Sequence, residues 1–399
     1  MMKISEQLDV LTSRAVDLHS REELEKKLIR SQQTGKPLRI KYGADPSAPD
    51  IHLGHTVGLR KLREFQELGH TVVFIIGDFT GMIGDPSGKS KTRKALTREE
   101  VAENAKSYQE QVFKVLDPAK TELRFNGEWF TPMTFDEVIR LSARVTVAQM
   151  LQRDDFAKRH AGNQPISLVE FLYPLIQGHD SVVVEADMEL GGTDQLFNLL
   201  LGRELQKQAG QEPQVVMTLP LLEGLDGVQK MSKSLNNYIG ISESPTQMFG
   251  KAMSISDELM WRYYELVLGW PGEKVSVLRG QVEKGARNPR EVKDELAREI
   301  IAQFHDVDAA KAASEEFARV FSKGALPDEV ETYALPSEVV LLDLLADQGL
   351  VASKGEGRRL LKQNAVKLDD AVVTDPFLTL VPGGEHVLKV GKRRFLKLT

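Results

Sequence analysis

Hydrophobic and polar positions along the first 220 residues predict an alternation of strands and helices. Short apolar runs at residues 38–42 and 71–76 have the length and composition of buried strands. Between them, apolar residues at helical spacing predict a helix over residues 55–68, which Gly69 ends. A strand, a helix and a second strand in this order imply parallel strands joined by a right-handed crossover.

The same alternation continues along the chain. Residues 5–33 predict an N-terminal helix, and a capping box that begins at Thr97 predicts another helix after it. Further strands are predicted at 121–125, 181–185 and 214–219, and further helices at 134–152, 167–178 and 193–208. The predicted fold class is therefore α/β, with a Rossmann-like doubly wound parallel sheet.

The pattern changes after residue 243. Residues 245–325 are amphipathic and helical, whereas glycine and prolines at 321–336 mark a linker. The last part predicts two short helices followed by strands near 371–373 and 386–398. We therefore expect an N-terminal helical segment, a Rossmann-like domain, a helical connector with its linker, and a small α+β module, at residues 1–33, 34–243, 244–336 and 337–399.

The composition is that of an ordinary soluble globular protein. Of 399 residues, 41% are hydrophobic and 28% are charged, and the net charge is −6. The chain has no cysteine, which excludes disulfides, thiolate metal sites and a cysteine nucleophile. The first 20 residues lack a signal-peptide core, and the apolar run at 72–76 is far shorter than the ~20 residues of a membrane span. We therefore expect a cytoplasmic protein that contacts no membrane.

Charge is distributed unevenly. Residues 351–399 hold ten Lys or Arg and five Asp or Glu, so this tail is basic although the whole chain is acidic. Such asymmetry indicates either a nucleic-acid contact at the C-terminus or the solvated surface of a small domain.

The first motif whose residues could take part in binding or catalysis is His52-Leu53-Gly54-His55, on the loop that enters the helix after the first strand. A helix start offers unpaired N–H groups and the positive end of the helix dipole, which suit an anion such as a nucleotide phosphate. Gly54 leaves room for a base or ribose against the backbone. The alternatives are two surface histidines or a metal site, but no third ligand stands at a recognisable spacing.

The second motif is Lys230-Met231-Ser232-Lys233-Ser234, which follows Gly224-Leu225-Asp226-Gly227 and therefore lies on a solvent-reachable loop. Two lysines three residues apart can clamp a polyphosphate, while the hydroxyls add donors. The alternative is a solvated pair of charges.

A third motif, Gly84-Asp85-Pro86-Ser87-Gly88-Lys89-Ser90, invites comparison with the phosphate-binding P-loop, G-x-x-x-x-G-K-[ST]. That pattern requires a glycine at position 83, where this chain has isoleucine. A P-loop kinase or NTPase is therefore rejected.

A fourth feature is a polar stripe on an otherwise apolar helix. Tyr173, Gln177 and Asp180 stand at i, i+4 and i+7 and share one face. A polar face in an apolar helix is expected to line a cavity or to face solvent.

Together these motifs resemble those of a known family. The HLGH and KMSKS sequences resemble the two signatures of class I aminoacyl-tRNA synthetases. Residues 84–93, the Tyr173–Asp180 stripe and Gly191-Gly192-Thr193-Asp194-Gln195 resemble segments of tyrosyl-tRNA synthetases of the bacterial type. Tryptophanyl enzymes are relatives that share a GxDQ segment but lack the C-terminal module.

The resemblance implies a set of roles for individual residues. His52, His55, Lys230 and Lys233 would be catalytic. The ATP site would comprise Asp45, Ser47, Gly54, Lys89, Arg93, Gly192, Asp194, Lys230 and Lys233. The tyrosine site would comprise Asp85, Tyr173, Gln177, Asp180 and Gln195, with Asp180 accepting from the phenol. A second partner for the phenol would be Lys41, by its position before Gly43-x-Asp45-Pro46, with the neighbouring Tyr42 as the alternative.

The tail resembles a small RNA-binding module that is shared with a ribosomal small-subunit protein. The resemblance lies in residues 353–366 and implies that Arg358, Arg359 and Lys362 contact tRNA phosphates. The implied activity is ATP-dependent ligation of L-tyrosine to tRNA(Tyr) through tyrosyl-adenylate, releasing AMP and pyrophosphate.

The resemblance also implies Mg²⁺ together with ATP, no metal site in the protein itself, a homodimer and no DNA binding. Two alternatives remain open from the sequence. One is an RNA-binding or splicing protein that has kept the fold and lost catalysis, and the other is specificity for tryptophan.

Overall fold

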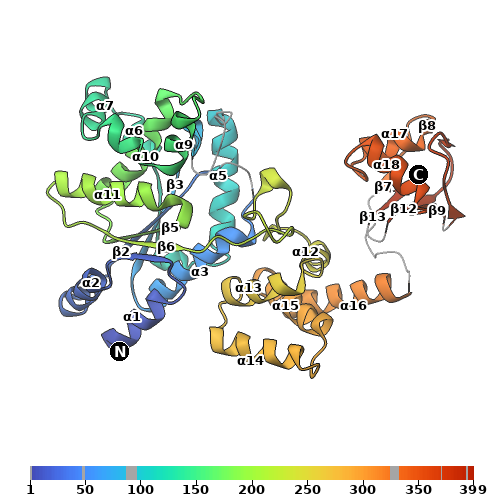
Figure 1. Cartoon of the computed structure of the whole chain (residues 1–399), viewed down its shortest axis with the longest axis horizontal. Helices are drawn as coiled ribbons and strands as arrows, with labels where there is room; N and C mark the ends of the chain where they lie inside the picture. Colours follow the sequence, from blue (N-terminus) through green and yellow to red (C-terminus); the bar gives the residue numbers. More distant parts are fainter. Residues whose placement is uncertain (1, 47–49, 87–96, 324–331, 370, 392–393) are drawn as a thin grey trace. The chain divides into compact units, whose positions relative to one another are not determined.

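The structure is a computed structural model that describes residues 2–46, 50–86, 97–323, 332–369, 371–391 and 394–399. It divides into two compact units, Met1–Asp306 and Val307–Thr399. The first unit contains a sheet flanked by helices and then a run of helices, and the second contains one long helix and a small sheet module (Figure 1).

Within the described residues, the first unit is built around a six-stranded sheet with the order β1-β6-β5-β2-β3-β4. Its strands are β1 (Asp17–His19), β2 (Arg39–Ala44), β3 (Thr71–Ile76), β4 (Thr121–Phe125), β5 (Met188–Gly192) and β6 (Val215–Leu219). All neighbours run parallel except β1, which lies antiparallel to β6. This confirms the expected doubly wound parallel sheet. Such sheets bind ligands beyond the carboxyl ends of the strands, where the strand order reverses, and here that point lies between β2 and β5.

The central strands are held by a continuous apolar run. On β3, the residues from Val72 to Ile76 are at most 1% exposed. β2 pairs with β3 through Ile40 and Val72, and its other edge pairs Lys41 with Glu189 on β5. A strand that is covered on both faces requires such an uninterrupted run, which explains why the sequence located β3.

Helices cover both faces of this sheet, and two of them approach each other closely. The main ones are α3 (Leu53–Glu67), α5 (Arg98–Val112), α10 (Leu168–Val183) and α11 (Leu196–Gln208). A Cβ atom added at Gly178 of α10 would lie 2.9 Å from a methyl group of Leu205 and 3.2 Å from the backbone nitrogen of Gly202 on α11. Glycine is therefore required where α10 and α11 pack together.

The N-terminal segment is not the single helix that the sequence predicted. It forms α1 (Ile4–Thr12) and α2 (Arg21–Thr34), with β1 between them. Arg14 takes a left-handed conformation, with φ of 65°, that ends the first helix. Ser20 then caps the second, because its hydroxyl accepts from the backbone N–H of Glu23 at 3.3 Å.

Two further predictions required correction. The valine-rich run at 181–185 was predicted as a strand, but α10 continues through it to Val183, and the strand β5 begins only at Met188. A short apolar run fits a buried helix end as well as a strand. The predicted helix at 134–152 is interrupted between α7 (Phe135–Ser142) and α8 (Val147–Met150), where Thr146 caps α8.

After the sheet, the chain forms the expected helical region. It consists of α12 (Pro245–Ala252), α13 (Asp257–Leu266), α14 (Gly272–Glu283) and α15 (Pro289–Phe304). Shorter helices of the first unit are α4 (Thr80–Ile83), α6 (Gly127–Phe130) and α9 (Asp154–Ala161). Among the residues that the structure describes, none of the helices combines the length and apolar composition needed to cross a bilayer.

The second unit contains α16 (Val307–Lys323) and a small α+β module. In the described part of this unit, a five-stranded sheet has the order β10-β9-β12-β13-β7, and β11 pairs with β8. The elements are α17 (Leu341–Asp347), α18 (Lys354–Lys362), β7 (Thr332–Tyr333), β8 (Val339–Val340), β9 (Val366–Leu368), β10 (Ala371–Val372), β11 (Thr379–Leu380), β12 (His386–Val390) and β13 (Arg394–Leu398).

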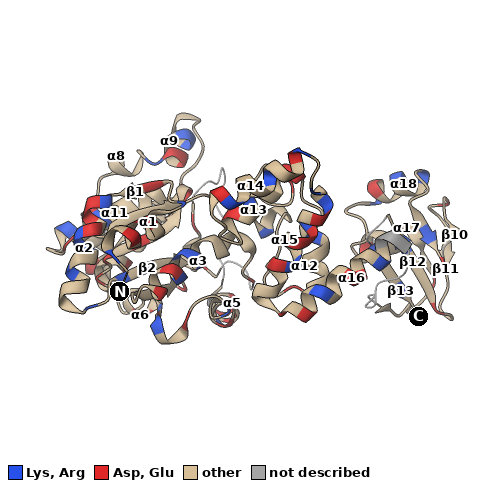
Figure 2. Ribbon diagram, turned by 90° about the horizontal axis from the view of Figure 1, so that it is seen from below, with Lys and Arg blue, Asp and Glu red and all other residues tan. Residues whose placement is uncertain are grey.

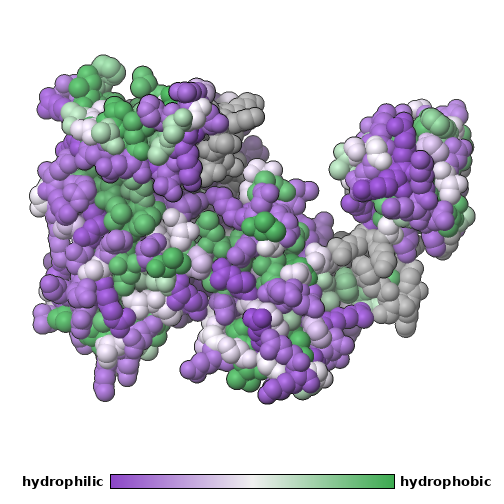
Figure 3. All heavy atoms as spheres, in the orientation of Figure 1, coloured by the Kyte–Doolittle hydropathy of each residue, from purple (hydrophilic) through white to green (hydrophobic). Residues whose placement is uncertain are grey.

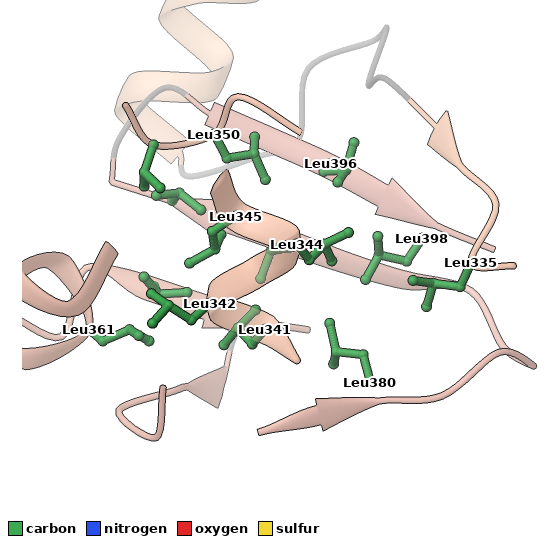
Figure 4. Close-up of a cluster of buried hydrophobic side chains, with 14 residues drawn as sticks. Leu335, Leu341, Leu342, Leu344, Leu345, Leu350, Leu361, Leu380, Leu396 and Leu398 are labelled. Carbon is green, nitrogen blue, oxygen red and sulfur yellow. The ribbon is translucent and has the colours of Figure 1, made fainter. Parts of the chain in front are cut away.

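Leucine side chains from the helices and strands form the core of this module (Figure 4). Leu335 belongs to that core, and β7 pairs with β13, so the packed module includes residues before position 337. Gly357 lets α18 lie on α17, because a Cβ there would be 2.7 Å from a methyl group of Leu342.

Candidate active site

A cavity of about 570 Å³ opens at the carboxyl ends of β2 and β5. Its lining brings together most of the residues singled out from the sequence, from five separate segments. These are Asp45, His52, Gly54, His55, Asp85, Tyr173, Gln177, Asp180, Gly192, Asp194, Gln195, Lys230 and Lys233. Ser47, Lys89 and Arg93 lie outside the described residues, and Arg358, Arg359 and Lys362 belong to the second unit.

The two histidines stand at the start of α3 with their rings stacked, 3.8 Å between centroids. Nδ1 of His55 accepts from the backbone N–H of His52 at 3.2 Å, which leaves the proton of the neutral ring on Nε2. Burial lowers the pKa of His52 to about 2 and that of His55 to about 4. At neutral pH both rings are therefore uncharged, and they can stabilise phosphate only as hydrogen-bond donors.

Backbone pairing holds the lysine loop against this helix start. The N–H of Leu53 donates to the carbonyl of Ile239 at 2.9 Å, and the N–H of Ile241 donates to the carbonyl of Ile51 at 2.9 Å. Within the loop, the Asn237 side chain accepts from the N–H of Ser232 at 2.8 Å. These contacts bring the two signature sequences, which are far apart along the chain, to one side of the cavity.

Each lysine of the loop is paired with a carboxylate of the cavity. The ammonium of Lys230 lies 2.7 Å from Asp194, and that of Lys233 lies 2.6 Å from Asp50. Asp50 was not identified from the sequence. Its place two residues before His52, on the loop that enters α3, is the one signal that could have found it.

The polar stripe of α10 faces the cavity as expected. Asp180 is 3% exposed, and burial raises its pKa to about 7. The indole N–H of Trp129 donates to Asp180 at 2.9 Å, and the amide of Asn126 donates to it at 3.4 Å. Both donors follow the carboxyl end of β4. That position at a strand end could have pointed to Asn126 and Trp129, but no motif marks them.

Tyr173, on the same helix face, is hydrogen-bonded to the carboxylate of Asp45. The phenol of Tyr173 donates to Asp45 at 2.8 Å, and the hydroxyl of Thr80 donates to the other oxygen of that carboxylate at 2.6 Å. Asp45 was expected in the ATP site and Tyr173 in the tyrosine site, so this hydrogen bond joins the two expected sites.

Of the two candidates for the second phenol partner, Tyr42 lines the cavity, whereas Lys41 is not among its lining residues. Lys41 is fully buried, and its ammonium lies 2.8 Å from Glu189, its cross-strand neighbour on β5. It also donates to Ser181 at 2.8 Å and to the carbonyl of Gln177 at 2.7 Å. Successive strand residues face opposite sides of a sheet, so Tyr42 points elsewhere and lines the cavity, and burial raises its pKa to about 12.

Asp85 and Gln195 both line the cavity, and the carboxylate of Asp85 accepts from the side-chain amide of Gln195 at 2.8 Å. A buried guanidinium, that of Arg153, lies 3.8 Å from the same carboxylate. Arg153 carries no motif signal in the sequence, and only the tertiary fold places it there.

Comparisons with known proteins show the family of the chain. Residues 32–322 match the family described as tRNA synthetases class I (W and Y). The chain is 55% identical to the tyrosine–tRNA ligase of Desulfotalea psychrophila over 100% of this chain and 99% of that protein. It is 57% identical to the tyrosine–tRNA ligase of Colwellia psychrerythraea, over 94% of this chain and 95% of that protein.

Solved structures show the same fold. The tyrosyl-tRNA synthetase of Archaeoglobus fulgidus complexed with L-tyrosine superposes with a TM-score of 0.63 at 23% identity, covering 78% of this chain and 100% of that one. The family match over residues 32–322 and the full-length identity lead to one conclusion: the chain belongs to the class I tRNA synthetases of the tryptophan and tyrosine group, among the tyrosine–tRNA ligases.

Proposed function

We propose that this chain activates L-tyrosine with ATP in the cavity at β2 and β5 and transfers the tyrosyl group to tRNA(Tyr). The observation that carries this assignment is the chemistry of the cavity lining. It includes the buried carboxylate of Asp180 as well as two histidines at the start of α3 and the two lysines of the loop held against that helix start. An acceptor for a phenol and donors for a polyphosphate are what the two substrates require.

The activation step forms one bond and breaks another. An oxygen of the tyrosine carboxylate attacks the α-phosphorus of ATP, the bond from that phosphorus to the bridging oxygen breaks, and pyrophosphate leaves. A ribose hydroxyl of tRNA then attacks the acyl carbon, and AMP leaves. Neither step needs a covalent enzyme intermediate, so the protein acts by positioning and by stabilising charge.

The histidines and the lysines are proposed to have different roles, because the histidines are neutral and the lysines are charged. His52 and His55 donate hydrogen bonds to the transferring phosphate as neutral rings, because burial keeps their pKa values low. Lys230 and Lys233 supply the positive charge for the departing pyrophosphate. Mg²⁺ is proposed to accompany ATP as its counter-ion.

Asp180, which also lines the cavity, accepts a hydrogen bond from the tyrosine phenol. Trp129 and Asn126 hold its carboxylate in place. The α-ammonium of tyrosine lies near Asp85 and Gln177, which both line the cavity.

The test of the activity is ATP–pyrophosphate exchange with tyrosine, tryptophan, phenylalanine or no amino acid. We expect exchange with tyrosine and little with the others. Exchange that depends on tryptophan would establish the alternative specificity. The absence of exchange with every amino acid would support an RNA-binding protein that has lost catalysis.

The C-terminal module is proposed to bind tRNA. Arg358, Arg359 and Lys362 are exposed on α18, whose ribbon carries basic positions in blue in Figure 2. A chain ending at Lys323 lacks this module and is expected to exchange pyrophosphate normally while charging tRNA poorly. Normal charging by the shortened chain would refute the role of the module.

We also propose that two copies form a homodimer, which acts in the cytoplasm without binding DNA or a membrane. Support for the dimer comes from large apolar side chains exposed on α7, α8 and the start of α10, where Figure 3 shows hydrophobic surface. Phe135, Val147 and Leu168 are 80%, 65% and 82% exposed. Soluble proteins rarely leave such clusters uncovered. Sedimentation of the unsubstituted protein and of Phe135→Asp tests the dimer. We expect the unsubstituted protein to be a dimer and the added charge to disrupt it. A monomeric unsubstituted protein would contradict the proposal.

A further inference from the structure

Arg153 is a buried cation beside the amino-acid end of the cavity, and the activity described above gives it no role. It is 4% exposed and stands at the N-cap of α9. Its Nε lies 2.8 Å from Asp155, and its guanidinium carbon lies 4.9 Å from the centre of the Phe156 ring. These two contacts fix the guanidinium, so its remaining N–H groups point in set directions.

Those N–H groups reach the residues expected to bind the amino acid. One donates to the side-chain carbonyl of Asn198 at 3.3 Å, and another lies 3.8 Å from the carboxylate of Asp85. A guanidinium can only donate hydrogen bonds. The oxygen of Asn198 therefore faces Arg153, and its amide nitrogen faces the other way.

The amide nitrogen of Asn198 donates to two glutamines. It lies 2.8 Å from Oε1 of Gln177 and 3.1 Å from Oε1 of Gln195. The nitrogen of Gln195 then donates to Asp85 at 2.8 Å. Each link has one donor and one acceptor, so Asn198 directs the oxygens of both glutamines, while the nitrogen of Gln177 faces Glu189 at 3.5 Å.

The orientation matters for a substrate that carries an ammonium group. With Oε1 of Gln177 directed by Asn198, its second lone pair can accept from an ammonium ion. If the amide of Gln177 were reversed, its N–H groups would face the ammonium, which is itself a donor.

We propose that Arg153 is a positioning residue that, through Asn198, selects the amide orientation in which Gln177 and Gln195 bind the α-ammonium of tyrosine. The proposal rests on the proposed function, in which Asp85 and Gln177 contact that group. Arg153 itself does not touch the substrate.

The test compares two ligands in the full-length protein without ATP. They are L-tyrosine and 3-(4-hydroxyphenyl)propanoate, which lacks the ammonium, and their dissociation constants are measured for the unsubstituted protein and for Arg153→Met. We expect the variant to bind tyrosine at least tenfold more weakly and the desamino ligand within twofold of normal. Asn198→Ala breaks the same chain with a smaller change and should give the same split. Arg153→Lys, which keeps a donor and the charge, should restore part of the affinity for tyrosine.

Each other result overturns the proposal. If Arg153 only repelled the ammonium through its charge, Arg153→Met would bind tyrosine more tightly. If Arg153 served only to stabilise the fold, both ligands would bind more weakly by the same factor. Arg298→Met is the matched control, because Arg298 also lies 2.8 Å from an aspartate but on α15.

The failure of the proposed function is recognisable separately. In that case the unsubstituted protein would bind tyrosine and the desamino ligand equally well, which would show that the cavity has no site for the ammonium. A protein that distinguishes the two ligands while Arg153→Met and Asn198→Ala leave that distinction unchanged would refute only the positioning role.

Discussion

Replacing Asp180 with asparagine tests two effects of its buried carboxylate. One is on the free energy of unfolding, and the other is on selectivity for tyrosine. The side chain is 3% exposed, and burial raises its pKa from an ordinary 3.8 to about 7. Asparagine has the same shape but no charge. We expect Asp180→Asn to lose selectivity for tyrosine over phenylalanine and to gain stability above pH 7.

The stability change follows from proton linkage. Because the pKa is higher in the folded state, the unfolded chain releases its proton first as pH rises. The folded state of the unsubstituted protein therefore loses stability between about pH 4 and pH 7, and the loss is complete above pH 7. The separation of the two pKa values corresponds to roughly 4 kcal/mol at 1.36 kcal/mol per pH unit. Asparagine avoids this cost but offers one acceptor where aspartate offers two, which costs about 1–3 kcal/mol at Trp129 or Asn126. The net gain expected at pH 8 is roughly 1–3 kcal/mol.

The selectivity change follows from hydrogen-bond strength. A bond from the phenol to a charged acceptor contributes about 1.5–3 kcal/mol, and one to a neutral acceptor about 0.5–1.5 kcal/mol. Selectivity should therefore fall by about 1–2 kcal/mol, or roughly fivefold to thirtyfold. A site built to hydrogen-bond a hydroxyl rejects the analogue that lacks it, because the buried polar group is then left unpaired.

The assay is pyrophosphate exchange, with kcat/KM measured for tyrosine and for phenylalanine, together with denaturant unfolding at pH 5 and pH 8. Asp294→Asn, which removes a carboxylate from α15 outside the cavity, is the control. An unchanged ratio of kcat/KM values would refute the assignment of Asp180 as the reader of the phenol. A stability difference that does not grow from pH 5 to pH 8 would refute the raised pKa.

Three further predictions test other parts of the structure. Lys233→Ala should raise the activation free energy of adenylate formation by about one to a few kcal/mol, the value of one oriented donor. Tyrosine binding measured without ATP should be unchanged, and an equal loss of tyrosine affinity would place Lys233 in the amino-acid site. Gly58→Ala should lower the melting temperature, because the added methyl group would lie 2.8–3.0 Å from the ring of Tyr42, and overpacking costs about 1–3 kcal/mol; an unchanged melting temperature would show that the ring moves aside at little cost. Arg358→Ala should flatten the salt dependence of tRNA affinity by about one unit of log–log slope and leave exchange intact, and an unchanged slope would show that Arg358 contacts no phosphate.

Local sequence patterns predicted the elements whose structure is decided locally. The continuous apolar run located β3, and the capping box at Thr97 located α5, where the N–H of Glu100 donates to the Thr97 hydroxyl at 3.2 Å. β1 could not be predicted in this way. Its three residues form a strand only because they pair with β6, some 200 positions along the chain.

The same distinction applies to the site. Motifs identified residues that are close together in sequence, such as His52 and His55. Asp50 lines the cavity, and the tertiary fold brings Trp129 and Arg153 against its lining residues Asp180 and Asp85; no motif marks these three. For Lys41, position alone could not show that Glu189 on the neighbouring strand would take up its charge.

The ion pairs of the lysine loop influence which anions the cavity attracts. Lys230 lies 2.7 Å from Asp194 and Lys233 lies 2.6 Å from Asp50, so the cavity carries its own counter-ions. A small anion such as inorganic phosphate gains little by replacing a carboxylate that already neutralises its lysine. Under the proposed function, a nucleoside triphosphate would replace both carboxylates, and its ribose would hydrogen-bond to the carboxylate of Asp194 that the lysine has left. Self-neutralisation would then favour ATP over smaller anions before any base is recognised.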